Sequence, residues 1–497
     1  MPLRSAAAPS PRDHPSIMRR TKIVATLGPA TDDPAVLDAV IAAGVDVVRL
    51  NYSHGTQDSH RERLALLRKH SQARATPIGV ISDLQGPKIR IQRFRETPVF
   101  LREGQAFTLD MDLPENAGDR HQVGVTYRDL PRDVAPGDTL LIDDGRIVLE
   151  VQEISGSRVH CLVRMGGALS DRKGLNRAGG GLSAGALTDK DRSDLRHAVD
   201  LGADYIAISF PRSAADIEEA RRLVVEAEGR GGIIAKIERA EALQHIEEIL
   251  LAADGIMIAR GDLGVEIGDA ALPPAQKRLI ALARDKNRVV ITATQMMESM
   301  IENHIPTRAE VFDVANAVLD GTDAVMLSAE TSIGKHPQRA VAAMDRICRE
   351  TERHWGTQGA DYRIEAHFSR IDEAIAMSVM YAANHIGAKA IAALTETGST
   401  CMWMSRIRSD IPIFAFTRSA ETLRKTTLYR GVCPIAFDVT HTDFLQVNRE
   451  MVAILLERRA VREGDVLIIT KGDLRGSAGG TNGMKIVRVG ELAPDSA

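Results

Sequence analysis

Eight short apolar segments, each followed by an amphipathic stretch, constrain the fold of this chain more than any other feature. They begin near Thr21, Val45, Pro77, Tyr205, Ile233, Gly255, Val289 and Ala324. Apolar runs of this length are typical of strands covered on both faces, as in a parallel sheet. Between them, residues 34–44, 59–71, 215–229 and 309–320 repeat apolar side chains three and four apart, which indicates helices. This alternation predicts an α/β chain built on a (β/α)₈ TIM barrel, whose active site lies at the carboxyl ends of the strands.

A long insertion separates the third and fourth apolar segments. Residues 92–187 alternate apolar and polar side chains with a period of two, and turn signals occur at Asp144-Gly145 and Ser155-Gly156. These features predict hairpins. We therefore expect a small all-β domain, a β-barrel lid inserted over the barrel mouth. The glycine-rich run at 179–185 is either a hinge for this lid or a plain linker.

The 497 residues are too many for one core and predict about three domains. Residues 1–20 are polar and predict a disordered tail. The barrel is expected at 21–91 and 188–352. After a charged connection, residues 362–497 predict a third domain with an open, mostly parallel α/β sheet, whose strands are expected near 388–394, 411–416, 434–439, 466–470 and 484–489.

Bulk properties exclude several classes of protein. A net charge of −4 gives no basic excess for nucleic acid binding. No apolar run reaches membrane length, and the first residues lack the apolar core of a signal peptide. The four cysteines are far apart, so neither a zinc site nor a disulfide framework is indicated. A cytoplasmic location is expected.

Charged residues follow two neighbouring apolar segments. Lys236 and Glu238 are two apart, and Arg260 and Asp262 repeat that spacing after the next segment. On strands, each pair would point to one side. Two carboxylates facing a lysine and an arginine suit a divalent metal that holds an anionic substrate. The alternative is a pair of salt bridges at the barrel rim.

Two loops in the third domain are candidates for regulation. The turn at 395–400 leads from a predicted strand into a helix, and the hydroxyls of Thr395, Thr397, Ser399 and Thr400 with backbone N–H groups could bind a phosphate. Helix capping explains the same residues. The glycine-rich turn at 471–480 either completes a regulatory site or is a hairpin tip.

Several polar segments at predicted strand ends resemble those of pyruvate kinases. They are Arg49–Gly55 (RLNYSHG), Asp83–Arg90 (DLQGPKIR), Lys236–Glu238 (KIE), Ala259–Glu266 (ARGDLGVE), Thr292–Met300 (TATQMMESM) and Met326–Glu330 (MLSAE). The resemblance runs from Thr21 to the end of the chain. It implies a barrel, an inserted β lid, a C-terminal regulatory domain and a bacterial type of enzyme.

The resemblance also implies the reaction. Phosphoenolpyruvate would transfer its phosphoryl group to ADP, giving pyruvate and ATP in the last step of glycolysis. Lys236 would neutralise charge on the phosphoryl group, which Arg49 would also bind. Thr294 would help to deliver a proton through water. The N–H groups of Gly261 and Asp262 would hold the substrate carboxylate, and Glu238 and Asp262 would bind Mg²⁺, for which Mn²⁺ could substitute.

The resemblance places the nucleotide phosphates near Asn51, His54, Arg90 and Lys173. Because a histidine at a strand end is often structural, His54 has a second interpretation. A potassium site would comprise Asn51, Ser53, Asp83 and the carbonyl of Leu84. Family members that require K⁺ carry a glutamate where this chain has Lys88. Our hypothesis is that the Lys88 ammonium replaces K⁺.

Two alternatives remain open from the sequence. A Mg²⁺-dependent lyase that uses an enolpyruvate would need a similar acidic pair, though neither the lid nor Lys173. A catalytically silent metabolite sensor would need only the C-terminal domain, and the presence of Lys236, Glu238, Asp262 and Thr294 argues against it. The resemblance further implies allosteric regulation, with a phosphorylated effector near 395–400, and a homotetramer.

Overall fold

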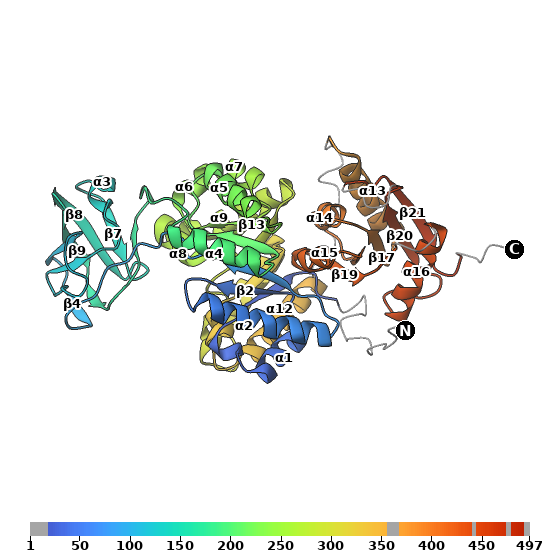
Figure 1. Ribbon diagram of the computed structural model, residues 1–497, viewed down its shortest axis with the longest axis horizontal. Coiled ribbons are helices and arrows are strands. Elements are labelled where there is room, and N and C mark those ends of the chain that lie inside the picture. Colours follow the sequence, from blue (N-terminus) through green and yellow to red (C-terminus); the bar gives the residue numbers. More distant parts are fainter. Residues whose placement is uncertain (1–17, 355–366, 440–443, 474–478, 492–497) are drawn as a thin grey trace. The chain divides into compact units, whose positions relative to one another are not determined.

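The computed structural model of the protein describes residues 18–354, 367–439, 444–473 and 479–491 (Figure 1). Of the tail predicted over 1–20, only residues 18–20 fall within these ranges. The chain divides into two compact units. One comprises Met1–Ser82, Leu201–Tyr205 and Ala283–Ala497, and the other comprises Asp83–Asp200 and Ile206–Leu282.

Eight strands form a closed barrel in the order β1-β16-β15-β14-β13-β12-β3-β2. They are β1 (Lys22–Thr26), β2 (Val47–Asn51), β3 (Gly79–Asp83), β12 (Tyr205–Ile208), β13 (Gly232–Ile237), β14 (Gly255–Ala259), β15 (Val289–Ala293) and β16 (Ala324–Leu327). β1 pairs in parallel with both β2 and β16. Nearly every strand residue is buried, as continuous apolar runs require. All eight predicted strands are therefore confirmed.

Helices follow the barrel strands, and Figure 1 shows them on the outside. They are α1 (Pro34–Ala43), α2 (Gln57–Ala73), α4 (Asp189–Asp200), α5 (Ala214–Glu226), α6 (Ala240–Gln244), α7 (Ile246–Ala252), α8 (Arg260–Ile267), α9 (Leu272–Asp285), α10 (Arg308–Asp320), α11 (Ala329–Ser332) and α12 (Pro337–His354). Several begin at side-chain caps: the Asp33 carboxylate accepts from Ala35 N, and the Thr56 and Thr307 hydroxyls cap α2 and α10. The four helices predicted from periodicity are confirmed.

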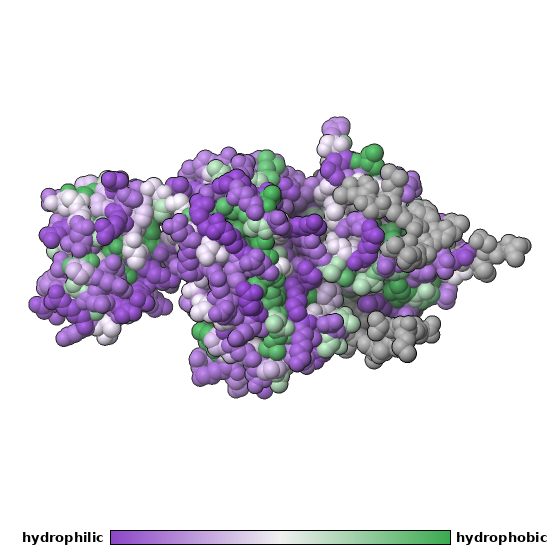
Figure 2. All heavy atoms as spheres, viewed as in Figure 1, coloured by the Kyte–Doolittle hydropathy of each residue, from purple (hydrophilic) through white to green (hydrophobic). Residues whose placement is uncertain are grey.

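The insertion between β3 and α4 consists of strands and one short helix. Its elements are β4 (Val99–Leu101), β5 (Ala106–Asp110), β6 (Gln122–Gly124), α3 (Leu130–Asp133), β7 (Thr139–Ile142), β8 (Ile147–Ser155), β9 (Arg158–Met165), β10 (Gly167–Leu169) and β11 (Leu175–Arg177). A six-stranded sheet, β11-β7-β8-β9-β5-β6, and the pair β10-β4 enclose one apolar core. Both predicted hairpin turns are present, with φ of +85° at Gly145 and +61° at Gly156. Figure 2 shows that the visible surface of this insertion is mainly hydrophilic.

The C-terminal domain contains a five-stranded sheet in the order β19-β18-β17-β20-β21. Its elements are α13 (Ile371–Ile386), β17 (Ala390–Leu394), α14 (Ser399–Ser405), β18 (Ile413–Thr417), α15 (Ala420–Lys425), β19 (Val432–Ala436), α16 (Phe444–Glu457), β20 (Val466–Lys471) and β21 (Gly483–Arg488). Four strands run parallel and β21 is antiparallel to β20. The expected open, mostly parallel sheet is confirmed. Over the described residues, every helix falls short of the length and apolar character needed to cross a bilayer.

Candidate active site

Lys236 is the centre of a buried polar cluster at the carboxyl ends of the strands. It lies in β13 and is 8% exposed. Its Nζ lies 3.0 Å from Oε1 of Glu238 and 3.2 Å from Oδ1 of Asp83, and it donates a 2.7 Å hydrogen bond to Oγ of Ser209. Residues two apart along an extended chain point to the same side. The predicted juxtaposition of Lys236 and Glu238 is therefore present.

The electrostatics of Glu238 favour an additional cation. Its carboxylate is buried, and its Oε2 accepts a 2.9 Å hydrogen bond from the amide of Phe210. Burial raises the pKa of Glu238, Lys236 lowers this pKa, and the charges of Asp262 and Asp83 raise it again. Three carboxylates therefore repel one another here, and the ammonium groups of Lys236 and Lys88 offset part of that repulsion.

Glu238 and Asp262 have the chemistry of a magnesium site that the substrate completes. Mg²⁺ prefers oxygen ligands, and in phosphoryl-transfer sites it binds one or two carboxylates together with waters and substrate oxygens. Across the described part of the chain, no three His, Cys, Asp or Glu side chains are grouped so as to hold a metal by themselves.

The expected strand pairing of Arg260 with Asp262 is wrong. β14 ends at Ala259, and α8 begins at Arg260. On a helix, residues two apart do not face each other. Arg260 is buried and directs Nη1 to Oε1 of Gln276 in α9, at 3.5 Å. Asp262 and Gly261 instead occupy the first turn of α8, where the positive end of a helix favours an anion.

Lys88 contacts the acidic pair directly. Its Nζ lies 2.9 Å from Oδ1 of Asp262, in a half-buried salt bridge. Asp83, which the potassium hypothesis associates with Lys88, is instead paired with Lys236. The carbonyl of Leu84, another predicted potassium ligand, accepts a 2.7 Å hydrogen bond from Oγ of Ser209. The Lys88 ammonium is thus placed beside a candidate magnesium ligand.

β2 carries the predicted phosphate-binding arginine and the first nucleotide residues. Arg49 lies within β2, is 8% exposed, and donates a 3.2 Å hydrogen bond from Nη1 to Oγ1 of Thr26. Asn51 ends the strand, and its Oδ1 accepts from the amide of Ser53 at 3.1 Å. Ser53 and His54 lie in the exposed turn that follows. Ser53 and His54 thus follow the carboxyl end of β2, whereas Arg49 and Asn51 lie within the strand itself.

Thr294 has an unusual backbone conformation. It follows β15 directly and has φ of +65°, and Gln295 also has a positive φ of +53°. A positive φ is rare for a β-branched residue, and such strain concentrates at functional sites. Oγ1 of Thr294 bonds the carbonyl of Ala293 at 2.7 Å. The hydroxyl is therefore held in place at the strand end.

The two remaining nucleotide candidates lie where the insertion joins the barrel. Nη1 of Arg90 donates to the carbonyl of Arg172 at 3.1 Å, and Arg90 forms an isolated bridge with Gly174. Nζ of Lys173 pairs with Oδ1 of Asp143 at 2.8 Å, within the insertion. The Lys173 ammonium thus pairs with a carboxylate of the insertion itself.

Ser209 is a site residue that the sequence reasoning missed. Its hydroxyl accepts from Lys236 Nζ and donates to the Leu84 carbonyl, both at 2.7 Å. It links β13 to the end of β3. Its position directly after the fourth strand was the available signal, because polar residues follow the other strands in the same way.

Glu266 joins the insertion to the barrel. Its carboxylate accepts from the amide of Ala240 at 2.8 Å and from Nδ2 of Asn176 at 3.4 Å, and its carbonyl accepts from the amide of Gly179 at 2.9 Å. Asn176 and Gly179 belong to the end of the insertion. Burial raises the pKa of Glu266 to about 7. This anchor is a second residue that the sequence reasoning did not identify.

The raised pKa of Glu266 predicts a stability difference that depends on pH. Between about pH 4.5 and 7 the Glu266 carboxyl is ionised in the unfolded chain and protonated in the folded protein. The free energy of unfolding therefore falls as the pH rises through this range. Glutamine cannot ionise, so the free energy of unfolding of Glu266→Gln, taken relative to wild type, should rise by up to about 3 kcal/mol from pH 5 to pH 8. Urea unfolding of both proteins at the two pH values measures this change. An equal difference at both values would contradict the assignment.

The predicted effector turn does connect β17 to α14. Oγ1 of Thr395 accepts from the amide of Gly398 at 2.9 Å, and Thr397 bonds Ser399 through their hydroxyls at 3.2 Å. Thr400 bonds the hydroxyl of Thr481 at 2.8 Å. The charge of Glu396 in this turn is paired with Arg418 at 3.2 Å. In the neighbouring glycine-rich turn, residues 474–478 lie outside the described residues.

Comparisons with known proteins agree with the geometry. Residues 18–341 match the family model for the pyruvate kinase barrel domain, and residues 373–487 match that for the pyruvate kinase alpha/beta domain. Pyruvate kinase II of Salmonella typhimurium is 51% identical over 476 residues, which cover 95% of this chain and 99% of that one. Pyruvate kinase of Haemophilus influenzae is 49% identical over 462 residues, covering 92% and 96% of the two chains.

A solved structure of a pyruvate kinase from Cryptosporidium parvum superimposes with a TM-score of 0.89 at 35% identity, covering 97% of this chain and 98% of that one. These relatives support neither the lyase nor the metabolite-sensor alternative. The chain belongs to the pyruvate kinase family.

Proposed function

We propose that this enzyme transfers the phosphoryl group of phosphoenolpyruvate to ADP, giving pyruvate and ATP. The observation that carries this proposal is the buried Lys236 ammonium, 3.0 Å from Glu238, in a chain related to pyruvate kinases over nearly its whole length. A coupled assay with ADP and phosphoenolpyruvate tests it. ATP and pyruvate should form together, and their absence in the presence of Mg²⁺ would refute the proposal.

Lys236 would stabilise charge on the phosphoryl group as its bond to the enolate oxygen breaks. Phosphoryl transfer depends on in-line placement and on neutralised charge, and a fixed ammonium in a dry site provides the second. Asp83, Glu238 and Ser209 support this role because they orient Nζ from three directions.

Glu238 and Asp262 would hold the divalent cation, Mg²⁺ or Mn²⁺. When bound, such an ion supplies Lewis-acid stabilisation to oxygens of the substrate and phosphoryl group. The amides of Gly261 and Asp262, in the first turn of α8, would bind the substrate carboxylate. Arg49 would bind the phosphoryl group from β2, and the hydroxyl of Thr294 would orient the water that protonates the enolate carbon.

The nucleotide would be held by side chains from β2 and the insertion. We assign Asn51, His54, Arg90 and Lys173 to its phosphates, and the exposed position of His54 is compatible with this role. Residues 92–187 would act as a lid on the barrel of 21–91 and 188–352. Closure of the lid would bring Lys173 to the phosphates, which would make lid motion part of catalysis.

Turnover is expected to be independent of K⁺. Lys88 already provides a fixed ammonium 2.9 Å from Asp262, whereas the ligands assigned to K⁺ are Asn51, Ser53, Asp83 and Leu84. Rates in tetramethylammonium buffer should equal those with added KCl. Lys88→Glu removes the ammonium and should make turnover depend on K⁺. An absolute K⁺ requirement in the wild type would defeat the hypothesis.

Two exposed apolar surfaces support a homotetramer. Ile305 precedes α10 and is 73% exposed, and Phe312 lies in α10 and is 75% exposed. Met484 and Ile486 lie on the edge strand β21 and are 41% and 48% exposed. Large exposed apolar side chains and unpaired sheet edges commonly mark interfaces. Sedimentation equilibrium should give about four times the chain mass.

The C-terminal domain is the proposed site of regulation. The hydroxyl-rich turn at 395–400 of the domain at 362–497 would bind a phosphorylated effector, and phosphoenolpyruvate saturation curves with sugar phosphates and AMP would identify it. We propose a cytoplasmic location for the enzyme.

A further inference from the structure

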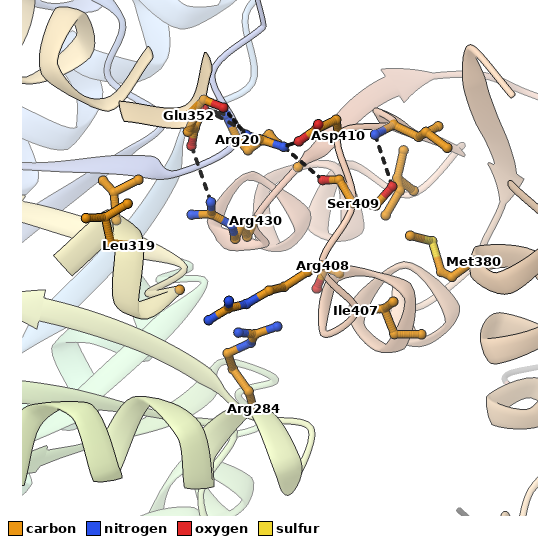
Figure 3. Close-up of a pocket in the computed structure, with 16 residues that line it drawn as sticks. Arg20, Arg284, Leu319, Glu352, Met380, Ile407, Arg408, Ser409, Asp410 and Arg430 are labelled. Carbon is orange, nitrogen blue, oxygen red and sulfur yellow. Dashed lines mark hydrogen bonds and ion pairs between the residues drawn. The ribbon is translucent and has the colours of Figure 1, made fainter. Parts of the chain in front are cut away.

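A pocket lies between the amino ends of the barrel strands and the C-terminal domain (Figure 3). We call it the seam pocket. Its barrel wall includes Arg20, which precedes β1, and Arg284 near the end of α9, and its C-terminal wall includes Arg408 and Arg430. The reaction described above uses the carboxyl ends of the strands. The seam pocket is therefore separate from the catalytic residues.

The lining of the seam pocket has an excess of positive charge. It contains four arginines, Arg20, Arg284, Arg408 and Arg430, and only two carboxylates, Glu352 and Asp410. These six residues leave an excess of two positive charges. Figure 3 shows Arg284, Arg408 and Arg430 directed into the same opening. Such an excess favours a divalent anion.

Carbonyl oxygens, which carry no charge, fix several of these guanidinium groups, and Arg20 also forms an ion pair with Asp410. Arg20 donates to the carbonyls of Ser409 at 3.1 Å and Glu352 at 2.9 Å. Arg430 donates to the carbonyl of Thr322 at 3.1 Å, and Arg284 donates to that of Arg406 at 2.7 Å. These guanidinium groups are thus held in position before a ligand binds, which lowers the conformational entropy lost on binding.

One carboxylate serves two of these arginines. Glu352 lies 3.6 Å from Arg430 Nη2 and 3.8 Å from Arg20 Nε. Burial lowers the pKa of Arg20, Glu352 opposes this effect, and the charge of Arg430 lowers the pKa further. The arginines therefore repel one another in this pocket, and a bound anion would relieve that repulsion.

The remaining lining limits the ligand to a small molecule. The walls include the apolar side chains of Leu319, Met380 and Ile407, and the cavity has a volume of about 60 Å³. A water needs roughly 10–15 Å³ by this measure, so the space holds several waters or one oxyanion head group. We propose that the seam pocket binds a divalent oxyanion, either phosphate or a small molecule that carries a phosphate or two carboxylates.

Such a ligand would contact the barrel and the C-terminal domain together and would stabilise their association. The seam pocket is a different site from the proposed effector turn. The effector turn lies at the start of α14, whereas Ser405, at the end of α14, lines the seam pocket. A ligand that binds only the folded protein raises its stability by mass action. This inference does not depend on the reaction that the enzyme catalyses.

Equilibrium binding of radiolabelled phosphate to the full chain, with phosphoenolpyruvate saturating the active site, tests the proposal. Arg408→Gln is the main variant, because this exposed arginine lines the seam pocket. We expect its phosphate affinity to fall at least about tenfold, as for a lost charged hydrogen bond. Arg418→Gln is the matched control: this exposed arginine lies beside the effector turn, and its removal should leave the affinity unchanged.

Competition with glycerol 3-phosphate and with succinate distinguishes the two sources of the anion, and displacement of phosphate by either supports the site. Equal phosphate affinity in wild type and Arg408→Gln would overturn the proposal. A loss of affinity in Arg418→Gln alone would also overturn it, because the anion would then bind at the effector turn.

Discussion

Replacing Lys236 with methionine is expected to lower kcat by about 10³-fold or more, which is the scale seen when a charge-stabilising group is removed from a transfer site. Methionine keeps much of the length of the lysine side chain and removes its charge. The ammonium lies within 3.2 Å of Asp83, Glu238 and Ser209, and methionine would leave these groups without that positive charge. Steady-state kinetics with phosphoenolpyruvate and ADP measure the loss.

Lys236→Met should still bind the divalent cation. Because Lys236→Met removes a positive charge beside Glu238, Mn²⁺ affinity measured by electron paramagnetic resonance is expected to stay the same or increase. Lys190→Met is a matched control, since Lys190 pairs with Asp194 on α4 and is half exposed. That variant should keep wild-type kcat. Turnover of Lys236→Met within a few fold of wild type would refute the catalytic role of this lysine.

Much of the fold could be predicted because the barrel strands are local and apolar. Each predicted segment contains its own signal, and burial on both faces of a strand leaves a continuous apolar run. The pairing of Lys236 with Glu238 could also be predicted, since both residues lie on one extended segment and the period of two applies directly. In these cases neighbours in sequence determine neighbours in space.

The remaining contacts of the site could not be read from periodicity. At Arg260 the chain changes from strand to helix, so the two-residue spacing that holds for Lys236 fails for Asp262. Lys88 meets Asp262 across 174 residues of sequence. No local pattern encodes a contact of that kind, because it depends on which loops the closed barrel brings together.

The contact between Arg406 and Asp323 also joins residues far apart in the sequence, and its loss should lower the free energy of unfolding. Both side chains are fully buried, with 0% exposure. Oδ2 of Asp323 accepts from Arg406 Nη1 at 2.7 Å and from the amide of Val290 at 2.9 Å, and Nη1 of Arg406 also donates to the carbonyl of Arg288 at 2.7 Å. An arginine of the C-terminal domain thus enters the amino end of the barrel strands.

Arg406→Ala and Asp323→Ala are each expected to lower the free energy of unfolding by about 3–5 kcal/mol, because each leaves the opposite charge buried without its partner. The double variant should lose less than the sum of the two, since it removes both charges. Urea unfolding followed by circular dichroism measures all three. Arg164→Ala breaks the exposed pair with Glu150 and should lower the free energy of unfolding far less, because water screens exposed ion pairs. Additive losses in the double variant would show that the buried charges do not interact, and the C-terminal domain would then be held to the barrel by its other contacts.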